Sequence, residues 1–118
     1  MKITVVHTKR SKFTNTVYVG RPSALGNPFS HLNLKHTIKV ASVEDAVERY
    51  AEWLDARIKD TYDVRDALAH IIDVAEEHNN EVYLACWCKD EVHPNTSDHQ
   101  CHADVIRSVI LHHLNNAN

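Results

Sequence analysis

The sequence predicts a small Rossmann-like α/β domain with three or four strands and three helices, and three observations support this class. Short β-branched runs near the N-terminus alternate with polar turns, two long segments in the middle have helical periodicity, and an uncharged apolar run precedes a last helical segment. The chain has 118 residues, of which 43% are hydrophobic and 25% charged. This composition is typical of a globular protein, and we expect a single domain over residues 1–118.

The first third of the chain is expected to contain the short strands. Residues 2–7 are rich in β-branched side chains and predict the first strand, which a polar, basic turn follows. Residues 16–19 predict a second strand that ends at Gly20. Residues 37–40 predict a short edge strand, whereas the segment before them has no clear period.

Two helices are expected in the middle of the chain. Ser42 and Asp45 form a capping-box-like pair that predicts the start of the first helix. The second helix is expected to start at an Asp63 cap and to end at Asn79-Asn80. Apolar residues at three- and four-residue spacing give each helix one face for burial: Val43, Ala46, Val47, Tyr50, Ala51, Leu54 and Ile58 in the first, and Val64, Ala67, Leu68, Ile71, Ile72 and Ala75 in the second.

The last strand and helix enclose the most informative corner of the chain. Residues 81–87 carry no charge after Glu81, which is typical of a central strand covered on both faces. A polar loop over residues 88–100 follows, and the final helix is expected from about His102 to Asn115. Because ligands of open α/β sheets bind at the carboxyl ends of the strands, we expect a binding site at this loop.

All three cysteines lie at this corner, and they support more than one interpretation. Cys86 and Cys88 point to the same face of an extended strand, and Cys101-His102 opens the last helix. These four residues, or His99 or His93 of the loop in place of His102, would supply the sulfur and nitrogen ligands of a structural zinc site. Alternatively, cysteines beside a buried strand are simply small apolar core groups, and this applies to Cys86 above all.

A further interpretation treats Cys101 as a reactive thiol. At a helix N-terminus, backbone amides and the helix dipole would stabilise its thiolate, with His102 or His99 as the proton partner. Asp98 and Asp104 are candidates for the carboxylate that orients such a histidine. The candidate catalytic residues are therefore Cys101 and His102, and whether the protein is an enzyme stays open.

The segment after the second predicted strand has the features of an anion site. Gly20 permits close backbone approach, and Arg21 offers a bidentate fork for phosphate or carboxylate. Ser23 and Asn27 can hydrogen-bond a sugar or a base. Gly26-Asn27-Pro28 is also a plain turn signal.

Charge is distributed unevenly along the chain, whose net charge is −3. Residues 1–41 hold seven basic and no acidic side chains, while residues 42–118 hold six basic and sixteen acidic ones. Such a basic half can attract an anionic ligand, although two oppositely charged halves also attract each other during folding. No stretch is apolar enough for a membrane helix or a signal peptide, so we expect a cytoplasmic protein with reduced thiols and no membrane partner.

Two separated motifs carry a resemblance to a known family. The first motif consists of residues 17–23 with Gly26-Asn27-Pro28-Phe29, and the second of Cys86-Trp87-Cys88 with Cys101-His102. In this order they resemble the motifs of the domain of unknown function 4326 family of bacteria and their phages. The resemblance implies a fold and a site location in a bacterial or phage-infected cell, and no established activity. Two positions depart from the family pattern, a common tryptophan and a usual glycine, which are here Leu25 and Ala103.

Together these features favour a protein that binds or processes a nucleotide or a phosphorylated sugar-like small molecule. Arg21 would hold the anion, Ser23 and Asn27 would orient it, and Cys101 with His102 would lie closest to any chemistry. The alternative is a non-catalytic module, zinc-stabilised or not, that binds a host protein or nucleic acid through its basic N-terminal half. Strong salt dependence of polymer binding would favour this alternative, whereas the acidic overall balance argues against a dedicated nucleic-acid binder.

Overall fold

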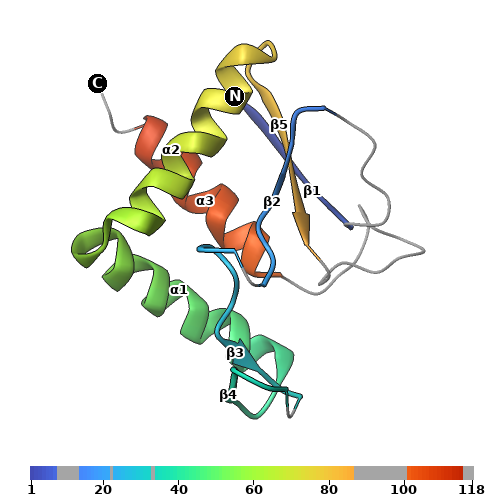
Figure 1. Cartoon of the computed structure of the whole chain (residues 1–118), viewed down its shortest axis with the longest axis vertical. Helices are drawn as coiled ribbons and strands as arrows, with labels where there is room; N and C mark the ends of the chain where they lie inside the picture. Colours follow the sequence, from blue (N-terminus) through green and yellow to red (C-terminus); the bar gives the residue numbers. More distant parts are fainter. Residues whose placement is uncertain (8–13, 22, 33, 87–100, 116–118) are drawn as a thin grey trace.

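The computed structural model of the chain describes residues 1–7, 14–21, 23–32, 34–86 and 101–115 (Figure 1). It confirms the α/β class and the three helices, which are α1 (Val43–Asp60), α2 (Tyr62–Glu77) and α3 (His102–Asn115). The main sheet has three parallel strands in the order β1-β5-β2, with bounds β1 (Lys2–His7), β2 (Thr16–Tyr18) and β5 (Glu81–Cys86). A second, two-stranded parallel sheet is formed by β3 (Phe29–Ser30) and β4 (Ile38–Lys39). The short strand expected near residue 38 therefore exists, but it pairs with β3 instead of the main sheet.

The central position of β5 follows from its apolar sequence, as predicted. It pairs in parallel with both neighbours, and the register sets Val5 and Val17 opposite Leu84. These three side chains share one face of the sheet, because side chains at matched positions of neighbouring strands point the same way. Their face packs in one core cluster with the buried residues of all three helices, among them Tyr50, Leu54, Val64, Ile71, Ile106 and Ile110.

The helices consequently cover one face of the sheet, and Figure 1 shows all three on one side of the strands. The described residues thus form two layers, helices on a sheet. On the opposite face of the sheet, Tyr83 is only partly buried whereas Val6 and Ala85 are buried, so the expected coverage of β5 on both faces holds only near its carboxyl end. None of the helices in the described ranges has the length and apolar character needed to cross a bilayer.

The start of α1 was predicted correctly, and the start of α2 was not. Ser42 Oγ accepts a hydrogen bond from the Asp45 N–H at 3.0 Å, as the capping-box pattern predicts. α2 begins at Tyr62 after the N-cap Thr61, so Asp63 lies inside the first turn. Thr61 also ends α1, where its N–H donates to Arg57 O. The prediction of Asp63 as the N-cap was wrong because an acidic residue is favourable in the first turn of a helix as well as at its N-cap. Thr61, with an extended backbone, is both the C-cap of α1 and the N-cap of α2.

A turn at the end of α2 leads the chain directly into β5. Asn79 and Asn80 have φ values of 59° and 61°, in the left-handed region that asparagine tolerates better than most residues. They close the helix where the sequence predicted. The register of β5 then places Cys86 opposite His7 and Ala85 opposite Tyr18. The carboxyl ends of all three strands therefore meet at one edge of the sheet, where the candidate site lies.

Candidate functional site

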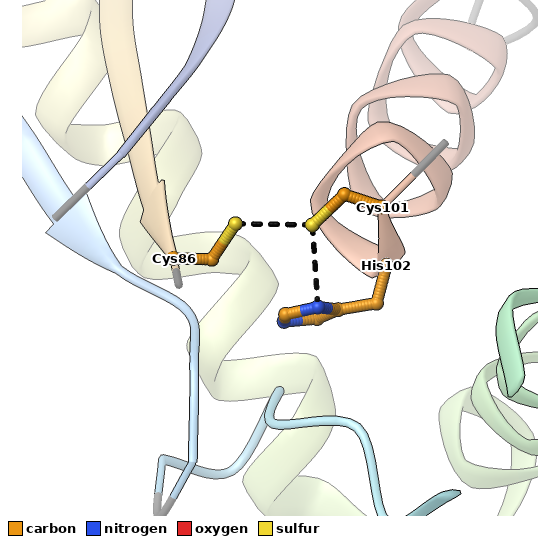
Figure 2. Close-up of side chains that lie close together, drawn as sticks. All are labelled: Cys86, Cys101 and His102. Carbon is orange, nitrogen blue, oxygen red and sulfur yellow. Dashed lines mark hydrogen bonds between the residues drawn. The ribbon is translucent and has the colours of Figure 1, made fainter. Parts of the chain in front are cut away.

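The carboxyl end of β5 and the N-terminus of α3 bring two thiols and an imidazole together (Figure 2). Cys86 Sγ lies 3.0 Å from Cys101 Sγ, and Cys101 Sγ lies 3.6 Å from His102 Nδ1. The three side chains are buried, with exposed fractions of 0%, 1% and 3%. The sulfur separation exceeds the length of about 2.05 Å of a disulfide bond, so the two sulfurs are not bonded to each other.

The remaining candidates of this corner cannot be placed. They fall outside the residues that the structure describes and are Cys88, His93, Asp98 and His99. Within the described part of the chain, Cys86, Cys101 and His102 form the cluster, with ligand atoms all within 4.8 Å of one another. Sequence reasoning named all three of these residues.

The orientation of His102 is set by a long-range hydrogen bond. Its Nε2 lies 2.8 Å from the carbonyl oxygen of Val19, which can only accept, so Nε2 carries the proton. Burial lowers the pKa of His102, and the nearby Arg21 guanidinium lowers this pKa further, while the Val19 carbonyl opposes both. The ring is therefore neutral near pH 7, and its unprotonated Nδ1 faces the thiol of Cys101.

Asp104 positions the cysteine through the backbone. Its Oδ2 accepts a hydrogen bond from the Cys101 N–H at 2.8 Å, and its Oδ1 pairs with Arg107 at 3.1 Å. This is the reciprocal half of a capping box, because the third residue of the helix satisfies the amide of the N-cap. The contact places Asp104, a candidate orienting carboxylate, on the backbone of Cys101. The Cys101 thiol consequently stands at a well-capped helix N-terminus.

Tyr50 packs against His102, a contact that the sequence pattern did not identify. Its ring lies edge-on to His102, with centroids 5.1 Å apart and planes at 77°. Its hydroxyl donates to the carbonyl of Leu25 at 2.6 Å. The helical period placed Tyr50 on the buried face of α1, but periodicity carries no information about which ring it meets. Tyr50 thereby links α1, the imidazole and the segment that follows β2.

That segment consists of two consecutive turns. The carbonyl oxygen of Gly20 accepts hydrogen bonds from both the N–H and the hydroxyl of Ser23, at 2.9 and 2.6 Å. The Gly26 N–H then donates to Ser23 O at 2.9 Å. A Cβ on Gly26 would lie 2.9 Å from Arg21 Cα, so glycine permits the close return of the chain. The Ser23 hydroxyl therefore stabilises the turn that presents Arg21.

Asn27 also holds the local structure. Its Oδ1 accepts from the Phe29 N–H at 2.9 Å, and its Nδ2 donates to Ala46 O at 3.4 Å. Both ends of the buried amide thus bind backbone groups. The predicted role of Ser23 and Asn27 in orienting a ligand stays a prediction, and the structure adds that both residues shape the loop.

A pocket of about 620 Å³ connects this loop with the cysteine corner. Of the predicted site residues, Arg21, Asn27, Cys101 and His102 line it, whereas Gly20, Ser23 and Cys86 do not. The rest of the lining comes from the segment that contains β3 and from the first turns of α1: Phe29, Ser30, His31, Leu32, Leu34, Val43, Glu44, Ala46 and Val47. These nine residues were not predicted as site residues, because the segment around β3 has no period and the residues of α1 were assigned to its buried face or its first turn.

In the described part of the chain, the pocket lining contains one guanidinium, that of Arg21, and one carboxylate, that of Glu44. Arg21 is exposed and lies close enough to His102 to affect its pKa. Within the described ranges, Arg21 takes part in none of the ion pairs. The exposed Glu44 is the carboxylate among the lining residues. A guanidinium at the rim is thus available to an anion, and a carboxylate is available to a hydroxyl.

Comparison with known proteins gives a family and no activity. No curated protein and no solved structure matches the chain. The model of the family described as a domain of unknown function, DUF4326, matches residues 3–112. This match spans β1 to α3 and includes both the Arg21 turns and the cysteine corner. The chain therefore belongs to the DUF4326 family.

Proposed function

We propose that the pocket binds a small anionic molecule, a nucleotide or a phosphorylated sugar-like compound, with Arg21 as the anchor of the anion. The observation that carries this proposal is that one pocket contains the Arg21 guanidinium, Cys101 and His102. Sequence positions 80 residues apart thereby contribute to a single concave site. A concave site with a few converging polar groups is the usual form of a small-molecule site.

The size and chemistry of the pocket support this class of ligand. Its volume of about 620 Å³ is within the range of roughly 300–1,000 Å³ that small-molecule sites occupy. Arg21 supplies a planar, permanently charged fork that matches phosphate oxygens. Phe29, Leu32 and Leu34 provide apolar surface for a base or a sugar face, and Glu44 can accept from a hydroxyl.

Processing of the bound molecule would involve the buried part of the lining at Cys101 and His102. Cys101 and His102 are the nucleophilic and basic groups there, and the neutral Nδ1 at 3.6 Å from the sulfur can accept the thiol proton. Whether the pocket turns its ligand over is a separate question from binding. A binding experiment therefore tests the proposal first.

The test is a calorimetric titration of the reduced, full-length protein with nucleoside mono-, di- and triphosphates, sugar phosphates and inorganic phosphate. We expect saturable binding of at least one organic phosphate. Arg21→Ala should weaken it about 10- to 100-fold, because a hydrogen-bonded pair to a charged group contributes roughly 1.5–3 kcal/mol. Lys59→Ala is the matched control, since Lys59 carries the same charge near the far end of α1, where it pairs with Asp55.

Equal affinities of wild type and Arg21→Ala would contradict the proposal, as would the absence of binding across the whole panel. Single-stranded DNA and RNA are included to test the alternative of a polymer-binding module. Polymer binding that falls steeply with salt, without binding of free nucleotides, would favour that alternative.

A further inference from the structure

We propose that Cys86 Sγ, Cys101 Sγ and His102 Nδ1 bind one zinc ion. This inference does not rest on anion binding by Arg21, and with zinc bound Cys101 and His102 would act as metal ligands and not as nucleophile and base. Thiolate sulfur and imidazole nitrogen are the preferred ligands of zinc in proteins. Figure 2 shows the three ligand atoms turned toward one another, from the end of β5 and the start of α3.

One of the distances between the ligand atoms matches a tetrahedral site, and all three atoms lie within 4.8 Å of one another. Zn–S bonds of about 2.3 Å and a Zn–N bond of about 2.0 Å put two sulfurs about 3.8 Å apart and a sulfur and a nitrogen about 3.5 Å apart. The observed separation of Cys101 Sγ and His102 Nδ1 is 3.6 Å. The two sulfurs, now 3.0 Å apart, would have to separate by less than about 1 Å.

The contacts behind the ligands favour metal binding over simple core packing. A histidine that binds zinc through one nitrogen usually donates its other N–H to a carbonyl or carboxylate, which fixes the tautomer. His102 does this with Val19 O at 2.8 Å, so its lone pair is already on Nδ1. Asp104 accepts from the backbone N–H of Cys101 at 2.8 Å and so fixes the start of the helix that carries two of the three ligands. Sulfurs packed only for their apolar character would not need an imidazole nitrogen aimed at them.

The charge balance at the buried corner also favours zinc binding. Binding would release the two thiol protons, and two thiolates neutralise the charge of Zn²⁺, so no net charge is buried. The three ligands from the described part of the chain leave one tetrahedral position for a further ligand. Since Cys101 and His102 line the pocket, the ion would lie at the pocket wall.

The test is native mass spectrometry and metal analysis of the full-length protein, purified under reducing conditions, loaded with zinc and freed of excess metal by buffer exchange. We expect one zinc per chain. Cys86→Ser, Cys101→Ser and His102→Gln should each abolish stoichiometric binding. His70→Gln is the matched control, because His70 is an exposed histidine on α2 and should leave the zinc content unchanged.

Two measurements on the wild type keep the proposal testable if those variants fail to fold. Cobalt(II) in place of zinc should give a thiolate charge-transfer band and the visible bands of a tetrahedral ion. A chelator should lower the Tm, and added zinc should restore it, because an ion bound only to the folded state stabilises that state.

Three outcomes would overturn the proposal. They are a folded, reduced wild type that takes up neither zinc nor cobalt, full zinc retention in both serine variants, and a denatured mass that shows a Cys86–Cys101 disulfide in the reduced preparation. Because no nucleotide is present in these experiments, their failure is distinguishable from failure of the anion-binding proposal.

Discussion

The helix-covered face of the sheet and its carboxyl edge are both buried, but different forces hold them. On the face, Leu84, Ile71 and Ile106 pack without direction, as apolar side chains do. At the edge, His102 and Tyr50 are fixed by hydrogen bonds to the carbonyls of Val19 and Leu25. The stability of the helix-covered face therefore depends on how well apolar side chains fill the space between sheet and helices. The structure of the edge depends on the direction of a few hydrogen bonds.

The pocket adds a second contrast, because the residues of its lining differ in solvent exposure. Cys101 and His102 in the lining are buried, whereas Arg21, Leu32 and Leu34 in the same lining are exposed. A buried lining suits groups that must keep their geometry. An exposed rim suits a group that captures a ligand from solvent. Three substitutions test this division, in order of decreasing effect.

The largest effect is expected from a cavity in the helix-covered face. Ile106 is fully buried on α3, and Ile106→Ala should lower the free energy of unfolding by roughly 2–5 kcal/mol, since it removes buried methyl groups and leaves a cavity. Urea denaturation measures this loss. Leu32→Ala is the control, because Leu32 is 51% exposed at the rim and should change the free energy by about 0.5 kcal/mol or less. Equal losses would show that the rim is packed as tightly as the core.

An intermediate effect is expected where the chain returns against Arg21. Gly26→Ala places a Cβ 2.9 Å from Arg21 Cα, a backbone atom that cannot move alone. We expect the free energy of unfolding, measured by urea denaturation, to fall by about 1–3 kcal/mol, as at other overpacked sites. Gly20→Ala is the comparison, since its Cβ would meet the hydroxyl end of the Tyr18 side chain, which can rotate away at the cost of its hydrogen bond to Arg21 O. A larger loss for Gly20→Ala would contradict this account of the turns.

The smallest of the three effects is expected at the cap of α3. Asp104→Ala removes the acceptor of the Cys101 N–H and should cost about 1 kcal/mol of unfolding free energy. Asp55→Ala is the matched control, because its exposed pair with Lys59 contributes within about 0.5 kcal/mol. If both variants unfold at the same urea concentration, the carboxylate does not fix the helix start.

Much of the fold could be read from local patterns, and the exceptions have local causes. The cap at Ser42, the end at Asn79-Asn80 and the central position of β5 followed from residue types and periodicity. The start of α2 was misplaced because the sequence favours Asp63 equally well in a first turn. The strand β3 was missed because Phe29-Ser30 contains no β-branched residue and directly follows a turn signal, whereas the β-branched run at residues 37–40 predicted β4.

For the site, the sequence by itself determined which chemical groups stand at the ends of the elements. Arg21 follows β2, Cys86 ends β5, and Cys101-His102 opens α3, because strand ends and helix starts are encoded in neighbouring residues. Only the tertiary structure decided that the Cys86 and Cys101 sulfurs are 3.0 Å apart and that His102 binds the carbonyl of Val19. Those contacts, and the pocket lining from α1, depend on the parallel register and on helix packing. The hydrogen bond between His102 and Val19 joins residues 83 positions apart, and α3 also packs against β1, which no local pattern specifies.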